Sequence, residues 1–170
     1  MATWDKQRCS EMTTSSAKHF PASSESLFSV YLQLPLPERA VVEMAAAAWL
    51  PLSVPVLNRC LARVGMCRAN RAPLGEKCVN EMIRRLRKSG LIHQAGENSN
   101  AFHCQHLAEE IVRRMVHEGR FESYTQAVEE VTRNPYIHVS SDLPVLANNQ
   151  HSYCAIRTAF YRRRFDTLRT

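Results

Sequence analysis

Residues 74–89 contain the pattern that most restricts the fold of this chain, because apolar and polar side chains alternate in them with the period of an α-helix. Projected at about 100° per residue, one side of this segment is apolar and the other is mostly basic. The apolar side comprises Cys78, Val79, Met82, Ile83 and Leu86. The other side comprises Lys77, Asn80, Glu81, Arg84, Arg87 and Lys88. The sequence therefore predicts a helix that packs on a core and exposes a cationic face to water.

Two helices are predicted upstream of this segment, over residues 37–49 and 53–64. Each has a proline in its first turn, where the missing N–H costs nothing, and Pro51 stops the first of them. Ser53 is a suitable N-cap for the second.

A short β-hairpin is predicted directly after the basic helix. Gly90 ends the helical pattern, and residues 91–94 and 101–104 are extended segments separated by turn-forming residues at 95–100. The chain therefore predicts three helices followed by a hairpin.

Three more helices are predicted downstream, over residues 105–118, 123–133 and 151–168. Ser123 and Gln126 form a capping-box pattern at the start of the second. The packing positions expected in the last helix are Tyr153, Ile156, Phe160 and Leu168.

The positive charge of the chain is concentrated in residues 54–94, which hold nine basic side chains and two acidic ones. The whole chain has a net charge of +6, so this segment contains all of the excess. Charge gathered on one short segment indicates a polyanionic partner.

The string PLGEKCVNEMIRRLRKSGLIHQ, residues 73–94, resembles the recognition helix and first wing strand of MarR-type and related bacterial regulators. Val79, Leu86 and the run Gly90-Leu91-Ile92 occupy the family's apolar and turn positions. The resemblance covers residues 35–116 and implies a winged helix-turn-helix. The expected fold is mainly α with a small β-hairpin wing, followed by a C-terminal helical extension. The family's helix lies in the major groove of double-stranded DNA and its hairpin touches the minor groove, which implies a role in transcription regulation.

Three parts of the chain are distinguished on this basis. Residues 1–25 are rich in Ser and Thr and are expected to form a flexible arm. Residues 26–118 form the winged-helix domain. Residues 119–170 form the helical extension, whose helical pattern runs to the last residue. We therefore expect the extension to contact a homodimer partner or the remainder of a longer parent chain.

The outer side of helix 74–89 supplies the predicted nucleic-acid-binding residues. Asn and Arg side chains pair with adenine and guanine edges, so Asn80 and Arg84, one turn apart, are assigned to base contacts. Phosphate contacts require only position and charge. They are assigned to Lys77, Arg87 and Lys88. Arg71, in the preceding connection, is also predicted to bind nucleic acid.

Several features favour other functions. The connection 65–73 is longer than the usual turn of about 3–4 residues, the hairpin tip carries Glu97 and no Arg or Lys, and Glu76 and Glu81 would repel phosphate. The alternatives are a protein-docking or dimerisation module and a regulator with a small-molecule pocket beside the C-terminal helices. DNA binding requires an open helix face, docking predicts that residues 119–170 or another chain cover it, and a ligand requires an enclosed apolar pocket.

No catalytic motif is present: the sequence lacks GxxxxGK[ST], GxSxG, HExxH and GxGxxG. We expect a non-enzymatic protein without a cofactor. A second basic cluster, which extends a nucleic-acid surface or is merely solvated, comprises Arg157, Arg162, Arg163, Arg164 and Arg169.

Several histidines and cysteines are of types that bind metals or act in redox chemistry. His103, Cys104 and His106, with His93 across the hairpin, are the candidate metal ligands. Consecutive residues of a strand point to opposite faces, so His103 and Cys104 do not converge and no metal is predicted. Cys78 is assigned to the buried side of its helix as a structural thiol.

The six cysteines are interpreted as reduced thiols. The N-terminal residues lack the apolar stretch of a secretory signal, and no segment approaches the roughly 20 apolar residues of a membrane span. The expected location is cytoplasmic.

Overall fold

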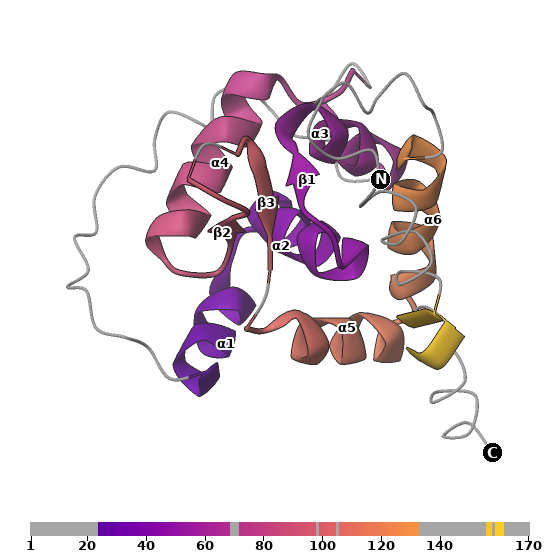
Figure 1. The fold of residues 1–170 in the computed structure, drawn as a ribbon. Helices are drawn as coiled ribbons and strands as arrows, with labels where there is room; N and C mark the ends of the chain where they lie inside the picture. The colour runs from indigo at the N-terminus through magenta and orange to yellow at the C-terminus, as the bar shows by residue number, and fades with distance from the viewer. Residues whose placement is uncertain are drawn as a thin grey trace.

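The computed structural model of the chain is mainly helical, with a small three-stranded antiparallel sheet (Figure 1). It describes residues 24–68, 72–97, 99–104, 106–132, 156–157 and 159–161. The helices are α1 (Ser24–Gln33), α2 (Leu36–Ala48), α3 (Val54–Arg63), α4 (Glu76–Lys88), α5 (Ala108–His117) and α6 (Phe121–Thr132). The strands are β1 (Leu52–Ser53), β2 (His93–Gln94) and β3 (Ala101–His103). Among the described helices, none has the length and apolar character needed to cross a membrane. The predicted arm lies outside the described residues, except for its last two, which begin α1.

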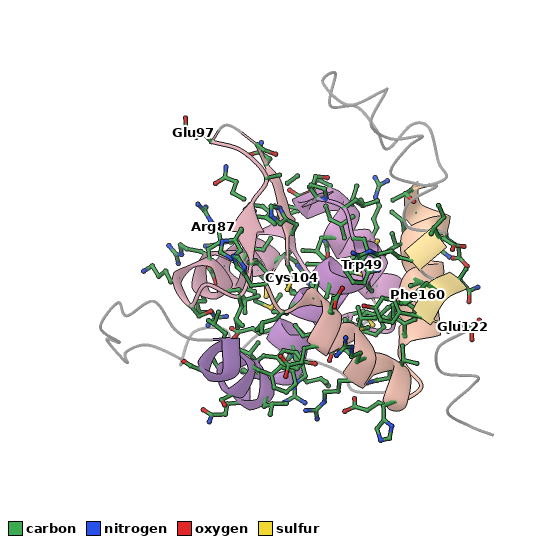
Figure 2. All side chains as sticks on the ribbon, turned by 60° about the horizontal axis from the view of Figure 1, so that its bottom comes forward. Trp49, Arg87, Glu97, Cys104, Glu122 and Phe160 are labelled. Carbon is green, nitrogen blue, oxygen red and sulfur yellow. The ribbon has the colours of Figure 1, made fainter. Side chains whose placement is uncertain are left out.

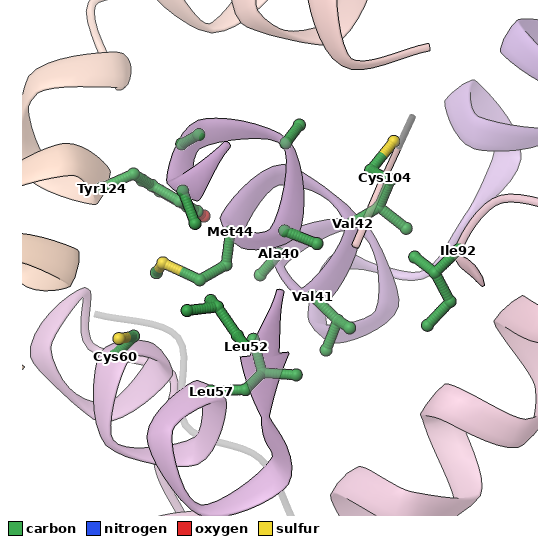
Figure 3. Close-up of a cluster of buried hydrophobic side chains, with 14 of the residues drawn as sticks. Ala40, Val41, Val42, Met44, Leu52, Leu57, Cys60, Ile92, Cys104 and Tyr124 are labelled. Carbon is green, nitrogen blue, oxygen red and sulfur yellow. The ribbon is translucent and has the colours of Figure 1, made fainter. Parts of the chain in front are cut away.

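Helix α2 is the centre of the packing. Every residue from Ala40 to Ala48 is buried, and α3, α4, α5 and α6 all pack against this helix. The run Ala45–Ala48 has side chains small enough for neighbouring helices to approach closely. Figure 3 shows Met44 of α2 in the same buried cluster as Leu52 and Leu57. The helix ends at Trp49, whose backbone is left-handed with φ 55°.

The three strands are arranged in the order β1-β3-β2. Phe102 of β3 pairs with Leu52 of β1 on one side and with Gln94 of β2 on the other. Strand β1 was not predicted, because two residues are too short to show an alternating pattern. Ser53 is the N-cap residue of α3, as predicted, although its side chain makes no capping hydrogen bond.

Helix α4 confirms the predicted division between a buried and an exposed side. Val79, Met82, Ile83 and Leu86 are buried, while Cys78 is only half-buried. The helix ends before Gly90, whose φ of 76° is readily adopted by glycine alone.

Two predictions for the downstream helices were wrong. Helix α6 begins at Phe121, so Ser123 lies inside the first turn and its hydroxyl donates to the carbonyl of Arg120. No capping box forms. In the part of residues 151–168 that the structure describes, the chain is helical at 156–157 and 159–161. Ile156 and Phe160 are 68% and 53% exposed, and Tyr161 is the buried side chain instead.

Tyr161 attaches this last segment to α2 and α6. Its ring stacks on Trp49 with a centroid separation of 5.7 Å and also contacts Phe121. The guanidinium of Arg157 lies 4.2 Å from the centroid of the Trp49 ring. Arg157 therefore packs on the core, while the other four arginines of the second basic cluster lie outside the described residues.

A buried carboxylate joins α1, α2 and the α5–α6 link. Glu43 is 1% exposed. The hydroxyl of Tyr31 donates to its Oε1 at 2.7 Å, and Nη1 of Arg120 donates to its Oε2. Burial raises the pKa of Tyr31 above its usual value, and the hydrogen bond to Glu43 is the next largest cause of this increase. Since an unpaired buried charge is strongly unfavourable, Arg120 is required for the packing of α2.

We expect Arg120→Ala to lower the free energy of unfolding by about 3–5 kcal/mol, because it leaves the buried Glu43 charge without its cation. Urea denaturation measures this change. Arg113→Ala is the matched control, since Arg113 forms a solvent-exposed pair with Glu109 at 3.6 Å, and such pairs contribute roughly 0–1 kcal/mol. Equal destabilisation by the two variants would contradict this account of Glu43.

Candidate nucleic-acid interface

The outward side of α4 forms one continuous polar and basic surface, here called the α4 face. It consists of five of the six residues predicted from the sequence to bind nucleic acid, all exposed: Lys77, Asn80, Arg84, Arg87 and Lys88. The sixth, Arg71, lies outside the described residues. Helix α4 lies along one flank of the molecule, with the β2–β3 hairpin beside it (Figures 1 and 2).

The orientation of the α4 face is fixed first by the buried side of the helix, which packs against α2 and α3. An ion pair adds to this, because Nη2 of Arg85 lies 2.9 Å from Oε1 of the buried Glu38 on α2. Burial raises the pKa of Glu38, and the charge of Arg85 opposes this shift. Arg85 therefore helps to hold α4 against α2, whereas its neighbour Arg84 is exposed.

The entry to α4 is also held in place. The side-chain amide of the buried Asn58 on α3 donates to the carbonyl of Leu74. In the long connection before it, Cys67 and Pro73 form an isolated antiparallel bridge, and the Arg68 amide donates to the Ala72 carbonyl at 2.9 Å. The two ends of the connection therefore lie side by side, so its extra length does not separate α3 from α4.

Arg87 differs from the other basic residues of the α4 face. Its guanidinium lies 5.9 Å from the centroid of the Phe102 ring on β3, within the range of a cation–π contact. Figure 2 shows Arg87 beside the hairpin. Arg87 therefore links α4 to the sheet, in addition to the phosphate contact predicted for it.

Two of the acidic residues near the α4 face, Glu76 and Glu81, should repel phosphate less than the sequence indicated. Glu76 lies in the first turn of α4, where a negative charge interacts favourably with the helix dipole. Glu81 is half-buried. Glu97, by contrast, is exposed at the tip of the hairpin (Figure 2). The positive charge of this region therefore belongs to α4 and not to the hairpin tip.

The described part of the helical extension packs away from the α4 face. Helix α6 contacts α2, α3 and α5, and α4 and α6 lie on opposite sides of the molecule in Figure 1. Tyr161 packs on Trp49 and Phe121. Within residues 119–132 and 156–161, the segments that the structure describes do not form the cover that the docking hypothesis requires.

A depression of about 500 Å³ lies where the start of α2, the end of α3 and the α5–α6 link meet. Arg39, Arg63, Arg120 and Glu118 are among the residues that line it. Leu36, Val64 and Met66 also line it, so most of its lining surface is apolar. It is open to solvent and is therefore not the enclosed pocket that the small-molecule alternative requires.

The histidines of the hairpin lie near one another, and Cys104 lies apart from them. His93 and His103 are direct partners across β2 and β3, whereas Cys104 is buried. Burial raises the pKa of Cys104 to about 11 and that of Cys60 to about 12. Within the described residues, no three His, Cys, Asp or Glu side chains are already arranged to hold a metal ion.

Two structural pairs were missed by the sequence reasoning, namely Glu38 with Arg85 and Glu43 with Arg120. Each joins residues far apart in the chain, so neither charge pattern nor periodicity pairs them. The acidic residues within the otherwise apolar α2 were the available signal, since buried carboxylates need partners.

Comparisons of the chain with models of protein families, with curated proteins and with solved structures found no match. The geometry and charge of the α4 face are therefore the features that bear on function.

The two adjacent arginines of α4 should differ sharply in their effect on folding. We expect Arg85→Ala to lower the free energy of unfolding by about 1–3 kcal/mol, because it leaves the buried Glu38 without its partner. Arg84→Ala should change it by less than about 0.5 kcal/mol, as for most surface substitutions. Thermal and urea unfolding of both variants measure this difference. If Arg84→Ala were the more damaging variant, the assigned orientation of α4 would be wrong.

Proposed function

We propose that this protein binds double-stranded DNA as a winged-helix domain, with α4 in the major groove and without catalysis. The single observation that carries the proposal is the open α4 face, with Asn80 and Arg84 exposed between flanking lysines. The element order α2-β1-α3-α4-β2-β3 supports the winged-helix assignment. The added strand β1, which makes the hairpin part of a sheet, supports it further.

The dimensions of α4 suit this role. An α-helix is about 10–12 Å wide with its side chains, close to the roughly 12 Å width of the major groove. Its 13 residues give a length of about 20 Å. Lys77 and Lys88 are separated by about 16 Å along the axis, which places them to contact phosphates at the two edges of the groove. Asn80 and Arg84 lie between them, where base edges are reached.

The hairpin has a supporting role in this proposal. Its tip presents Glu97, which would repel the phosphates that border a minor groove. Phe102 instead contacts Arg87 and thereby helps to hold the C-terminal half of α4. This differs from the family that the sequence resembles, in which the hairpin touches DNA.

A protein-docking or dimerisation role is the second candidate, and one observation favours it. Val30 and Leu32 on α1 and Leu36 on α2 are 38%, 37% and 49% exposed. Apolar exposure of this kind suits contact with a second copy or with the rest of a longer chain. Such contact is compatible with DNA binding, because it involves residues outside the α4 face. A cytoplasmic location and a role in transcription regulation accompany the DNA proposal.

Fluorescence-anisotropy titration of a labelled random-sequence duplex tests the proposal. We expect binding at low salt whose logarithmic affinity falls linearly with log salt, by roughly 0.9 per phosphate contact. Lys77→Ala and Lys88→Ala should each reduce this slope by about 1. In a second titration, with a preferred sequence selected from a random pool, Arg84→Ala should weaken binding by about 1–3 kcal/mol.

Arg113→Ala on α5 is the control, because it removes the same charge from an exposed site outside the α4 face. It should leave the affinity nearly unchanged. Absence of binding at low salt, or equal loss in Arg84→Ala and Arg113→Ala, would refute the proposal. The docking role would then be the better account of the fold.

A further inference from the structure

The β2–β3 hairpin brings three imidazole rings together. His93 and His103 are paired residues of adjacent antiparallel strands, so their side chains emerge on the same face. Their ring centroids are 6.3 Å apart. The ring of His106, which follows β3, lies edge-on to His93 with a centroid separation of 5.2 Å.

Two ring nitrogens in this cluster are buried without a hydrogen-bond partner. Nε2 of His93 and Nδ1 of His103 are both shielded from solvent, and neither has a hydrogen-bond partner. Buried polar atoms without partners are rare in native proteins. The two atoms belong to cross-strand neighbours.

The backbone at Gly90 interacts with the His93 ring, whereas Nε2 of that ring has no partner. An Nδ1–H that donates to a backbone carbonyl would leave Nε2 as a free electron-pair donor. Histidines that bind metals in proteins are commonly oriented by such a second hydrogen bond.

We propose that His93 and His103 bind one divalent transition-metal ion of the imidazole-preferring class, such as Zn²⁺, across the hairpin. Neutral imidazole is the commonest metal ligand among side chains, and its nitrogen approaches zinc at about 2.0–2.1 Å. The proposal needs only these two protein ligands, since the described residues hold no set of three ligands already arranged around an ion. His106 packs against the ring of His93 and positions it.

The sequence argument against a metal site does not apply to this pair. That argument concerned His103 and Cys104, which diverge, and the buried Cys104 is not needed here. A bound ion would cross-link β2 to β3 next to Phe102, the residue that contacts Arg87 of α4. The site stands independently of DNA binding, because its ligands lie outside the α4 face.

Isothermal titration of the reduced 170-residue chain with ZnCl₂ at neutral pH tests the proposal. We expect His93→Gln and His103→Asn each to weaken binding at the hairpin site by at least about tenfold, the lower end of the loss seen when metal-site residues are altered. His117→Gln is the control, because His117 is exposed at the end of α5 and should not matter. Thermal unfolding without metal should show that all three variants fold like the wild type.

Co²⁺ provides a second readout that separates histidine from cysteine ligands. The hairpin site should give visible d–d bands without the strong sulfur-to-cobalt charge-transfer absorption of a thiolate complex. The proposal is overturned if wild-type protein binds no zinc at 100-fold molar excess, or if both hairpin variants bind as tightly as His117→Gln. A thiolate spectrum that persists in both variants would overturn it as well.

Discussion

The burial of α2 on all sides is the constraint on which the rest of the structure depends. Its small alanine side chains allow α3, α4, α5 and α6 to approach one axis. The same burial leaves the Glu43 carboxylate in need of partners, and hydrogen bonds from Tyr31 and Arg120 are among those that stabilise it. Because α4 rests on α2, the direction in which Arg84 points is set by packing that is remote from any DNA.

The arginines of α4 differ in what their side chains contact. Arg84, Arg85 and Arg87 are close in the chain, but each residue is rotated by about 100° from the last. Arg85 consequently meets Glu38, Arg87 meets Phe102, and Arg84 faces water. Net charge alone would have treated the three as equivalent. Only part of the positive charge is therefore free for an anionic partner.

Periodicity predicted what is local, and it did so well for α4 and for the extended segments after Gly90. Helix α4 spans Glu76–Lys88, within two residues of the predicted ends. Strand β1 was beyond this reasoning, since two residues become a strand only through pairing with β3. The burial of Tyr161 in place of Phe160 has a similar cause, because contact with Trp49 fixes which side of that segment faces inward. The exposed residues of the α4 face were predictable from spacing, whereas the anchors Glu38 and Asn58 were not, because they come from other helices.

Mapping of amide chemical-shift changes by NMR, on addition of a short DNA duplex to ¹⁵N-labelled protein, tests the central claim most directly. The account predicts that the largest changes fall on α4, at Lys77, Asn80, Arg84 and Lys88, with small changes on α5 and α6. Changes centred on α6 or on the exposed apolar residues of α1, with α4 unaffected, would contradict it.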